Sequence, residues 1–464
     1  MIKNHKLRVG IIPTRRGISS NRKGAFTIED ALQNKNEILE YVNQLKDDSV
    51  EILNIDWLNE EGIMYDISHV FTIAERLEKE NVDALFIIHC NFGCEEAVGK
   101  LCSILKKPVL LWGPRDKNIG DDGSRATDTQ CGLFASSRIL MRYGIKFTYI
   151  ENCRLTEKVF EEGFFNFLSV AVAVKAFKNL RIGQINSRPK PFTSVMYNES
   201  ELMEKFGIEI VPINIEIVKQ KMNEIMEKQI SNVEFTANDI KNRINCSQTD
   251  VNDLIKIAAL ILAVKELVLI NKCSAIAIEC WTVMPASLGV LPCFAIAELT
   301  DMGVPATCEA DINGAITSAL LTAAARGKAT TFFGEYTMRH PENDNAELIW
   351  HCGSFPYSLK KRSSQAELID GRANWEIEDG DITLARFDGD RGNYKLFAGQ
   401  AKGIQGPRTT GTYVWIETDN WTKWEKKLIN GPYIHHVSGI HGRYLSILQE
   451  MCKYIPYLTF DGVE

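Results

Sequence analysis

Short apolar runs alternate with amphipathic segments through the first 180 residues of the chain. Runs typical of buried strands begin at Leu7, Val50, Ala84, Pro108 and Lys146. Because strands that alternate with helices form βαβ units, the pattern predicts a doubly wound domain around a parallel sheet. The segments with helical spacing are residues 28–45, 70–80, 95–105, 133–143 and 159–177.

The same alternation continues to about residue 356 and then changes character. Further strand patterns begin at Arg181, Gly207, Ala275, Val304 and Ala329. After residue 356 the chain is rich in Gly, Thr, Trp and Asp, and its short alternating runs, such as DITLARFD and GTYVWIET, are typical of a small antiparallel barrel. The sequence therefore predicts two Rossmann-like, doubly wound α/β domains followed by a small C-terminal antiparallel β-barrel domain, with the bounds 1–180, 181–356 and 357–464.

The composition is that of an ordinary globular protein. Hydrophobic residues make up 45% and charged residues 24% of the 464 positions, which argues against a disordered or fibrous chain. The net charge of -7 argues against an extended nucleic-acid surface. No apolar run approaches the roughly 18 residues of a membrane span, and the one near the N-terminus is too short for a signal peptide. We therefore expect a cytoplasmic protein that binds neither nucleic acid nor membranes.

Twelve cysteines are scattered along the chain, many of them inside apolar segments. This distribution favours buried, reduced thiols over a disulfide framework. Cys90 and Cys94 lie close together, but no second pair with zinc-site spacing accompanies them. The cysteine spacing therefore predicts no structural zinc.

Carboxylates follow the predicted strands of the second domain. Glu279 follows AIAI, Glu309 and Asp311 follow VPATC, and Glu335 follows TTFFG. Because the carboxyl ends of parallel strands share one edge, these groups would repel one another unless a divalent cation lay between them. Two carboxylates beside a metal-bound substrate could also move a proton between adjacent carbons. The alternative for Asp311 is that it only caps the following helix.

Three of the eight histidines lie in the segment GPYIHHVSGIHG near the C-terminus. His436 could complete a carboxylate site as a neutral imidazole ligand. The alternative is a strand on which His435 and His436 point to opposite faces, so that at most one of them faces the site. His351 follows another predicted strand, and we place His351, His435 and Trp281 among the candidate substrate-binding residues.

Basic residues in the loop after the first predicted strand are candidates for binding an anionic group. Arg15 and Arg16 lie there together with Arg22 and Lys23, and arginine at a strand end suits bidentate recognition of phosphate, sulfonate or carboxylate. The alternative is a solvated charged face. Asn91, in a turn between a strand and a helix, is a candidate for binding hydroxyl groups. The chain lacks GxGxxG and GxxxxGK[ST], the usual signatures of dinucleotide and nucleoside triphosphate sites.

Seven segments that span nearly the whole chain carry a resemblance to a known family. They are LRVGIIPTRRG, HCNFGCEEAVGKL, RIGQINSRPKPF, ECW, CEADINGAITSALL, WHCGSFP and HHVSGIHG. Together they resemble the L-fucose isomerase and L-arabinose isomerase superfamily, in particular its fucose isomerase-like branch. The resemblance implies two Rossmann-like domains with a C-terminal β-barrel domain, a divalent cation such as Mn²⁺, and a homo-oligomer, commonly a hexamer, whose sites lie between subunits.

The resemblance also implies a set of metal ligands. In fucose isomerase a Glu, an Asp and a His hold the ion, and the Asp and the His match Asp311 and His436. The segment LPCFAIAEL offers no match for the Glu, so Glu279 and Glu309 are the candidates for the second carboxylate. We expect Asp311, Glu279 and Glu309 to act in catalysis, with Glu279 beside Asp311 and His436 in the metal site.

The predicted function is a metal-dependent aldose–ketose isomerase of carbohydrate metabolism that works through an ene-diol. The resemblance implies a pentose, a 6-deoxyhexose or a 6-substituted hexose as the sugar substrate. Fucose, arabinose and sulfoquinovose are examples, and the last of these would yield sulfofructose. The alternative is a non-catalytic sugar-binding or regulatory protein on the same scaffold.

Overall fold

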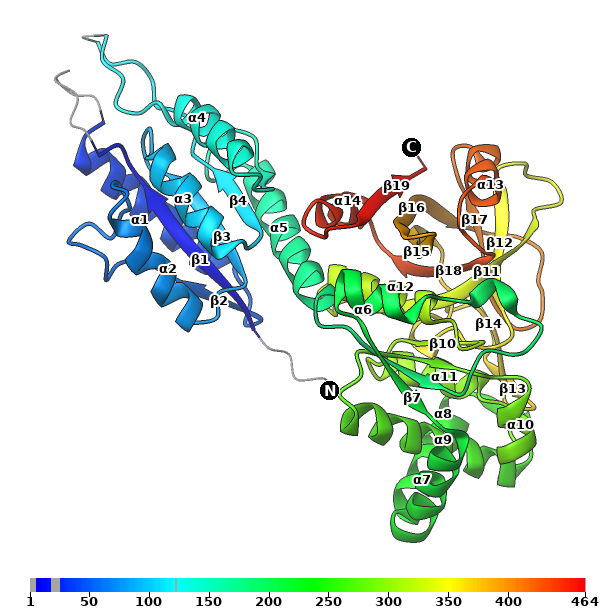
Figure 1. The fold of residues 1–464 in the computed structure, drawn as a ribbon. Helices are drawn as coiled ribbons and strands as arrows, with labels where there is room; N and C mark the ends of the chain where they lie inside the picture. The colour runs from blue at the N-terminus through cyan, green and yellow to red at the C-terminus, as the bar shows by residue number, and fades with distance from the viewer. Residues whose placement is uncertain (1–5, 18–25, 122, 464) are drawn as a thin grey trace. The chain divides into compact units, whose positions relative to one another are not determined.

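The chain forms two compact units, and the division between them falls after Lys175. The computed structural model of the protein describes residues 6–17, 26–121 and 123–463. Figure 1 labels the helices and strands of each unit. Within the described ranges, every helix is too short or too polar to cross a membrane.

The first unit is built on a five-stranded parallel sheet. Its strands follow the order β2-β1-β3-β4-β5, and every pairing is parallel. The order reverses between β1 and β3, and open sheets bind ligands at the carboxyl ends of the strands at such a position. The strands are β1 (Leu7–Thr14), β2 (Val50–Leu53), β3 (Ala84–His89), β4 (Val109–Trp112) and β5 (Thr148–Tyr149).

Helices cover both faces of this sheet. Phe86 on β3 belongs to the core under α1 and α5, whereas its neighbour Ile87 belongs to the core under α2 and α3. Successive residues of a strand point to opposite faces, so the sheet is doubly wound, as the sequence predicted. The helices are α1 (Ile28–Leu45), α2 (His69–Lys79), α3 (Glu95–Leu105), α4 (Thr129–Arg142) and α5 (Lys158–Phe177).

The second unit begins with a smaller parallel sheet in the order β10-β9-β6-β7. This sheet confirms the predicted second α/β series. Its strands are β6 (Arg181–Ile185), β7 (Glu209–Ile213), β9 (Ala275–Ile278) and β10 (Ala306–Thr307). The helices are α6 (Glu199–Phe206), α7 (Ile215–Lys228), α8 (Ile230–Arg243), α9 (Val251–Ile270), α10 (Val283–Leu288), α11 (Cys293–Asp301) and α12 (Ile312–Ala324).

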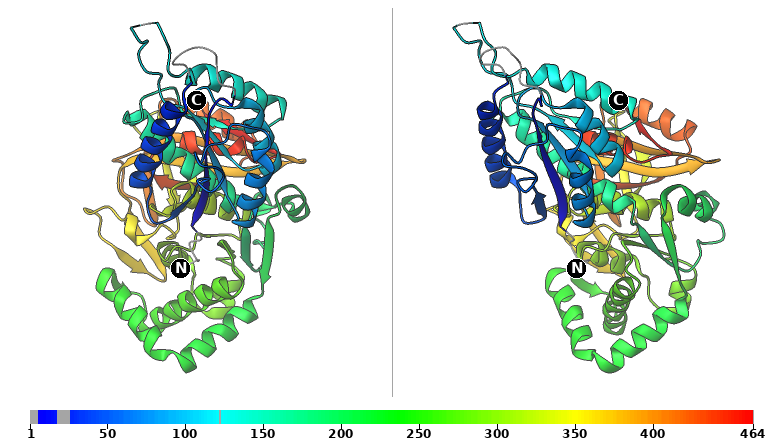
Figure 2. Two further views of the ribbon diagram at one scale, coloured as in Figure 1. Left: turned by 90° about the vertical axis from the view of Figure 1, so that its left-hand side faces the viewer. Right: turned by 60° about the vertical axis from the view of Figure 1, so that its left-hand side comes forward.

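A closed six-stranded antiparallel barrel follows. The strands run β16-β15-β18-β11-β12-β17, and a pairing between β16 and β17 closes the ring (Figures 1 and 2). Closure removes the exposed sheet edges, and it confirms the predicted barrel. The strands are β11 (Thr331–Arg339), β12 (Ala346–His351), β15 (Gly380–Asp390), β16 (Asn393–Ile404), β17 (Thr412–Glu417) and β18 (His436–His441).

One strand prediction is wrong. The apolar run that begins at Ala329 was expected to continue the second parallel sheet, but it forms β11, which pairs antiparallel with β12 and β18 in the barrel. A buried apolar run does not distinguish a parallel from an antiparallel strand. The division into domains at residues 180 and 356 stays a prediction.

Helix α12 connects the parallel sheet to the barrel. It contacts β9 and β10 on one side and β11, β15 and β18 on the other, and nearly all of its residues are buried. Gly314 shows why its residues are small, because a Cβ atom there would lie 2.5 Å from the ring of Phe333. The small residues of α12 therefore allow the parallel sheet and the barrel to approach each other.

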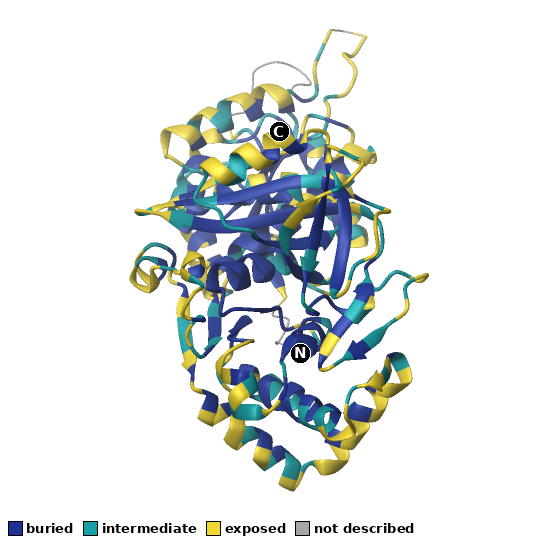
Figure 3. Ribbon diagram, turned by 90° about the vertical axis from the view of Figure 1, so that its right-hand side faces the viewer, coloured by how far each residue is buried: buried dark blue, intermediate teal, exposed yellow. Residues whose placement is uncertain are grey.

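Short elements complete the second unit. Figure 3 shows that the barrel strands are largely buried, whereas the outer helices of this unit carry exposed faces. The remaining elements are two 3₁₀ turns (Thr193–Val195 and Tyr357–Leu359), strands β8 (Asn245–Gln248), β13 (Glu367–Ile369), β14 (Arg372–Glu376) and β19 (Leu458–Gly462), and helices α13 (Trp421–Asn430) and α14 (Leu445–Cys452).

Candidate functional site

Glu309, two residues after β10, meets side chains from three barrel strands inside the second unit. Oε2 of Glu309 lies 3.5 Å from Nε2 of His351, the last residue of β12, and 3.8 Å from Nε2 of His436, the first residue of β18. Oε1 of Glu335 on β11 lies 3.6 Å from the same nitrogen of His351. Two carboxylates and two imidazoles therefore converge from four elements.

The register of the barrel explains part of this convergence. Glu335 pairs directly with His436 across β11 and β18, and side chains of directly opposed residues lie on the same face of a sheet. Strand β18 begins at His436, so His435 lies before it. The alternation of side chains along a strand therefore does not fix the direction of the His435 side chain. The alternative in which at most one of these two histidines faces the site does not hold, because ligand atoms of Glu335, His435 and His436 lie within 4.8 Å of one another.

A strained turn delivers Glu309 to this position. Glu309 and Ala310 have φ angles of 56° and 54°, in the left-handed region that non-glycine residues rarely adopt. Such conformations cost about 1–3 kcal/mol each and cluster at functional sites. The turn is held by hydrogen bonds from the Ala310 N–H to the Ile278 carbonyl and from the Asp311 N–H to the Cys308 carbonyl, at 3.1 Å each. The fold therefore holds Glu309 in a conformation that the local sequence does not favour.

Three buried polar atoms at the centre of the group have no hydrogen-bond partner among the described residues. They are Oε2 of Glu309, Nε2 of His351 and Nε2 of His436, and they lie within 4.8 Å of one another. Leaving a buried polar atom unpaired costs about 1–3 kcal/mol. One carboxylate oxygen and two imidazole nitrogens suit a divalent cation such as Mn²⁺. The residues present therefore fit the implied metal ion, because a cation among them would satisfy all three atoms.

Asp311 fixes the orientation of His436. Nδ1 of His436 lies 2.9 Å from Oδ2 of Asp311, so a proton on Nδ1 donates to the carboxylate and leaves the lone pair on Nε2. The same carboxylate accepts two hydrogen bonds from the buried guanidinium of Arg386. Although burial alone would raise it, the charge of Arg386 and the contact with His436 hold the pKa of Asp311 well below its usual value. Asp311 is therefore an ionised partner behind His436.

Asp311 also caps helix α12. Its Oδ1 accepts a hydrogen bond of 2.9 Å from the Gly314 N–H, so Asp311 does cap the helix, but capping is not its only role. Arg386 in turn holds Asp388, and Asp388 accepts a hydrogen bond of 2.9 Å from the Asn313 amide. With Arg386, His436 and Gly314 as partners, Asp311 is engaged on both oxygens. Direct metal binding by Asp311 stays a prediction, and these contacts do not favour it.

His351 is buried and has two possible tautomers. Its Nδ1 accepts the Cys352 N–H at 2.9 Å in one tautomer, and in the other it donates to Cys352 Sγ, which lies 3.3 Å away. The second tautomer leaves a lone pair on Nε2 for a metal ion. Burial alone would lower the pKa of His351, but the neighbouring Cys352 and Glu309 raise it well above its usual value.

Glu335 differs from Glu309 in its access to solvent. It is half-buried, whereas Glu309 is buried. Burial raises the pKa of Glu335 against the opposing effect of His351 and His436. A carboxylate at the edge of the site with a raised pKa is suited to accept and return a proton.

Glu279, the other predicted carboxylate, is fully engaged elsewhere. Its Oε1 accepts the N–H and the hydroxyl of Thr282 at 2.7 and 2.6 Å, and its Oε2 accepts the N–H groups of Val283 and Met284 at 2.9 and 3.1 Å. These four contacts occupy the acceptor positions of the carboxylate. Glu279 therefore fixes the start of α10, and its predicted roles in metal binding and catalysis stay predictions.

Aromatic side chains border the two histidines of the C-terminal segment. Phe192 lies 5.7 Å from the ring of His435, 5.8 Å from that of His436 and 6.0 Å from that of Trp281. Trp281 is exposed, and His435 is half-buried with a pKa lowered to about 4 by burial. The apolar faces of such rings suit the C–H face of a sugar. His435 thus lies beside His436, and Trp281 lies beside Phe192. Their role in substrate binding stays a prediction.

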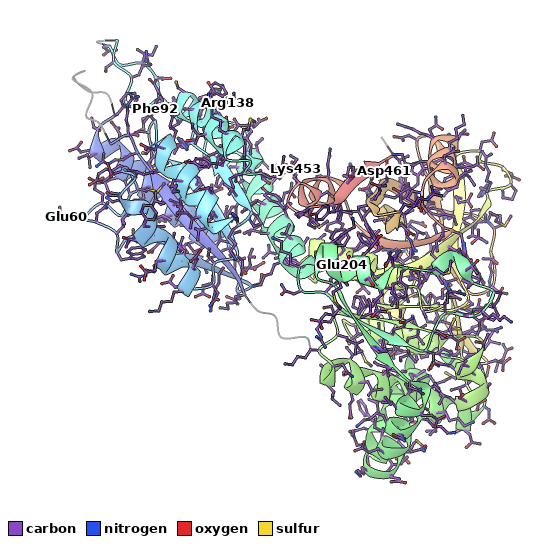
Figure 4. The ribbon with its side chains drawn as sticks, in the orientation of Figure 1. Glu60, Phe92, Arg138, Glu204, Lys453 and Asp461 are labelled. Carbon is purple, nitrogen blue, oxygen red and sulfur yellow. The ribbon has the colours of Figure 1, made fainter. Side chains whose placement is uncertain are left out.

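The remaining predicted binding residues lie in the first unit, at the carboxyl ends of β1 and β3. The guanidinium of Arg15 binds both oxygens of Glu61 and lies 3.8 Å from the ring of Tyr65. Arg16 lies 4.6 Å from the ring of Phe92, which Figure 4 labels, and its N–H donates to the Asn91 side chain at 3.0 Å. Arg15 is therefore committed to an ion pair, whereas the contacts of the Arg16 side chain within the described ranges are with the rings of Phe26 and Phe92. Arg22 and Lys23 lie outside the described residues.

Sequence reasoning missed Arg386. It lies in the segment DITLARFD, whose alternating pattern predicts a barrel strand with Arg386 as one of its polar positions. In the structure it is 1% exposed and links Asp311 to Asp388. An arginine at an inward position of a strand that is otherwise apolar was the available signal, since charged residues are almost never fully buried unless paired.

The chain is similar to a family and to several proteins of known name. The family described as "Fucose/sulfoquinovose isomerase, N-terminal domain" matches residues 11–178. A protein named sulfoquinovose isomerase from Priestia aryabhattai is 24% identical over 410 residues, which cover 86% of this chain and 90% of that protein. Proteins of the same name from Alkalicoccus urumqiensis and Clostridium sp. (strain MSTE9) are 25% and 24% identical and cover 67% and 56% of this chain and 70% and 57% of their own lengths.

The family match and these relatives support the fucose isomerase-like superfamily. The resemblance read from the sequence is therefore confirmed, and the relatives support an isomerase enzyme that acts on a sugar. The alternative of a non-catalytic binding protein rested on a missing carboxylate. In the structure, Glu309 and Glu335 both lie beside the two histidines.

Proposed function

We propose that the protein is a metal-dependent aldose–ketose isomerase whose metal ion is held by Glu309, His351 and His436. The observation that carries the proposal is the convergence of three buried, unpartnered ligand atoms from these residues. Mn²⁺ is the expected ion, because mixed carboxylate and imidazole ligands suit it. When bound, the ion supplies a positive charge that acidifies a substrate hydroxyl and polarises the carbonyl.

The residues around the ion have distinct roles in this proposal. Asp311 orients His436, in the manner of the carboxylate partners that orient metal-binding histidines. Glu335 removes the proton from C2 of the aldose and returns it to C1, which leaves a ketose by way of an ene-diol. Its raised pKa and half-buried position support this role. Phe192 and Trp281 would pack against the apolar face of the sugar.

The proposed substrate is a hexose with an anionic group on C6. The relatives named sulfoquinovose isomerase support a sulfonate, and conversion to sulfofructose is the reaction that we propose. Arg16 is our candidate for the sulfonate, because the structure commits Arg15 to Glu61. The resemblance implies a homo-oligomer with sites between subunits, and we propose such an assembly as the setting in which Arg16 reaches the sugar.

Nuclear magnetic resonance in D₂O tests the proposal. Sulfoquinovose, quinovose, fucose and arabinose are each incubated with the chelator-treated protein, with and without added Mn²⁺. We expect deuterium at C2 together with ketose from sulfoquinovose, only when Mn²⁺ is present. Ketose formation that is unaffected by chelation would contradict metal dependence, and exchange with fucose or arabinose alone would contradict the proposed substrate.

A further inference from the structure

Four cysteines gather beside the candidate metal centre, and the proposed reaction does not use them. Cys280 follows β9, Cys293 begins α11, Cys308 follows β10 and Cys352 follows β12. The first three are buried and Cys352 is half-buried. They come from four separate parts of the chain, so no zinc-site spacing marks them in the sequence.

Cys352 lies at the centre of this cysteine cluster. Its Sγ lies 3.3 Å from Sγ of Cys293 and 3.3 Å from Nδ1 of His351. The ligand atoms of Cys308, His351 and Cys352 lie within 4.8 Å of one another. Two thiolates on a tetrahedral Zn²⁺ lie about 3.8 Å apart, because each Zn–S distance is about 2.3 Å. Shifts of about 1 Å or less would therefore place the sulfurs of Cys308 and Cys352 around one ion with the ring of His351. Sγ of Cys293 contacts Cys352 but does not belong to this group.

The donor set distinguishes this cluster from the neighbouring site. Two cysteine sulfurs and one imidazole nitrogen form a Cys₂His set, which holds zinc in proteins with a fourth position left open. Thiolates select thiophilic cations, whereas the carboxylate and imidazole ligands of Glu309 and His436 suit Mn²⁺. Cys280 falls outside this set, because its Sγ faces Oε1 of Glu309 at 3.3 Å.

We infer that Cys308, Cys352 and Nδ1 of His351 form a second metal site, for a thiophilic divalent cation of the zinc type. Binding replaces the two S–H protons, which pass to solvent, with two metal–sulfur bonds. This inference does not depend on the proposed isomerase activity. It assigns a function to cysteines whose spacing alone predicted no zinc.

His351 couples the two sites. Nδ1 faces Cys352, and Nε2 faces Glu309. A neutral imidazole has one lone pair, so the ring serves one cation at a time. A cation at the cysteines therefore takes His351 away from the other ion and weakens Mn²⁺ binding.

Cobalt spectroscopy tests the second site directly. Co²⁺ is added to chelator-treated protein kept reduced with a phosphine, and the sulfur-to-cobalt charge-transfer band is recorded in the near ultraviolet. We expect this band in the wild type, a fall of half or more in Cys308→Ser and in Cys352→Ser, each of which removes one of two thiolates, and little change in Cys293→Ser. Cys280→Ser, a buried neighbour outside the set, and Cys102→Ser, a buried thiol of the first unit, should keep the band.

The outcomes separate this inference from the isomerase proposal. A wild type that shows no sulfur-to-cobalt band would overturn the second site, even if Mn²⁺-dependent isomerisation persists. A band that survives undiminished in Cys308→Ser but disappears in Cys280→Ser would also overturn the second site. A Cys293–Cys352 disulfide in protein isolated without reductant would overturn it as well. Circular dichroism of each variant shows that a lost band does not reflect unfolding. In a second readout, Zn²⁺ should raise free Mn²⁺, measured by electron paramagnetic resonance, more in the wild type than in Cys308→Ser.

Discussion

The side chain of Asp311 holds the side chain of His436, with 2.9 Å between Oδ2 and Nδ1. The carboxylate stays ionised because the guanidinium of Arg386 lies against it inside the protein. The ring is thereby fixed with its second nitrogen facing Glu309. This contact joins the start of α12, which is rich in small residues, to β18, the barrel strand that begins with His436.

Loss of the charge on Asp311 should weaken metal binding. In Asp311→Asn the carboxylate that orients His436 becomes an amide, and mutation of such partners typically costs 10- to 100-fold in metal affinity or activity. We expect Mn²⁺ affinity to fall by about that factor, measured by electron paramagnetic resonance of free Mn²⁺. Asp301→Asn is the matched control, because Asp301 is a carboxylate of the same unit that binds Ser358 and not a histidine. Equal affinities in Asp311→Asn and the wild type would contradict the orienting role.

Replacement of Glu335 should separate proton transfer from binding. Glu335→Gln keeps the shape of the side chain and removes its capacity to accept a proton. We expect kcat to fall by about 10²- to 10⁴-fold, the range for loss of a general base, while KM and Mn²⁺ affinity stay close to those of the wild type. Steady-state kinetics with the exposed Glu342→Gln as control checks this expectation. A loss confined to KM would assign Glu335 to substrate binding instead.

Arg16 and Arg15 should respond differently to truncation. If Arg16 binds the sulfonate, Arg16→Ala raises KM for sulfoquinovose by about 10-fold or more, since hydrogen bonds to charged groups contribute about 1.5–3 kcal/mol. The KM for quinovose, which lacks the sulfonate, should change little. Arg15→Ala instead leaves Glu61 without its ion-pair partner and should lower thermal stability. Equal effects of Arg16→Ala on the two sugars would rule out sulfonate recognition by this residue.

Glu347 on β12 should make folding stability depend on pH. It is 4% exposed, and burial raises its pKa to about 7. Between about pH 4 and about pH 7 the folded state holds a proton that the unfolded state has released, so the contribution of Glu347 to stability is greatest below about pH 4 and is lost as pH rises toward about 7. Glu347→Gln should flatten this dependence in urea unfolding of the metal-free protein at pH 5 and pH 8. Glu417→Gln, on the neighbouring strand β17, is the control. A dependence that is unchanged in Glu347→Gln would place its origin elsewhere.

The sequence was informative where local pattern determines structure. Buried apolar runs such as residues 84–89 identified the parallel strands, and the run of small residues after Asp311 identified α12. It was not informative where partners come from distant segments. The run at Thr331 could not reveal its antiparallel neighbours, and the four acceptor contacts of Glu279 depend on a short helix that carries little signal of its own. Arg386 and Cys352 acquire their partners only when the barrel closes on the parallel sheet.

Anomalous X-ray scattering from crystals grown with Mn²⁺ tests the central claim most directly. Data collected on both sides of the manganese absorption edge locate the ion without reference to activity. The account predicts one manganese peak bonded to Glu309 Oε2, His351 Nε2 and His436 Nε2. A manganese peak bonded to Glu279, or none within reach of Glu309, would contradict it.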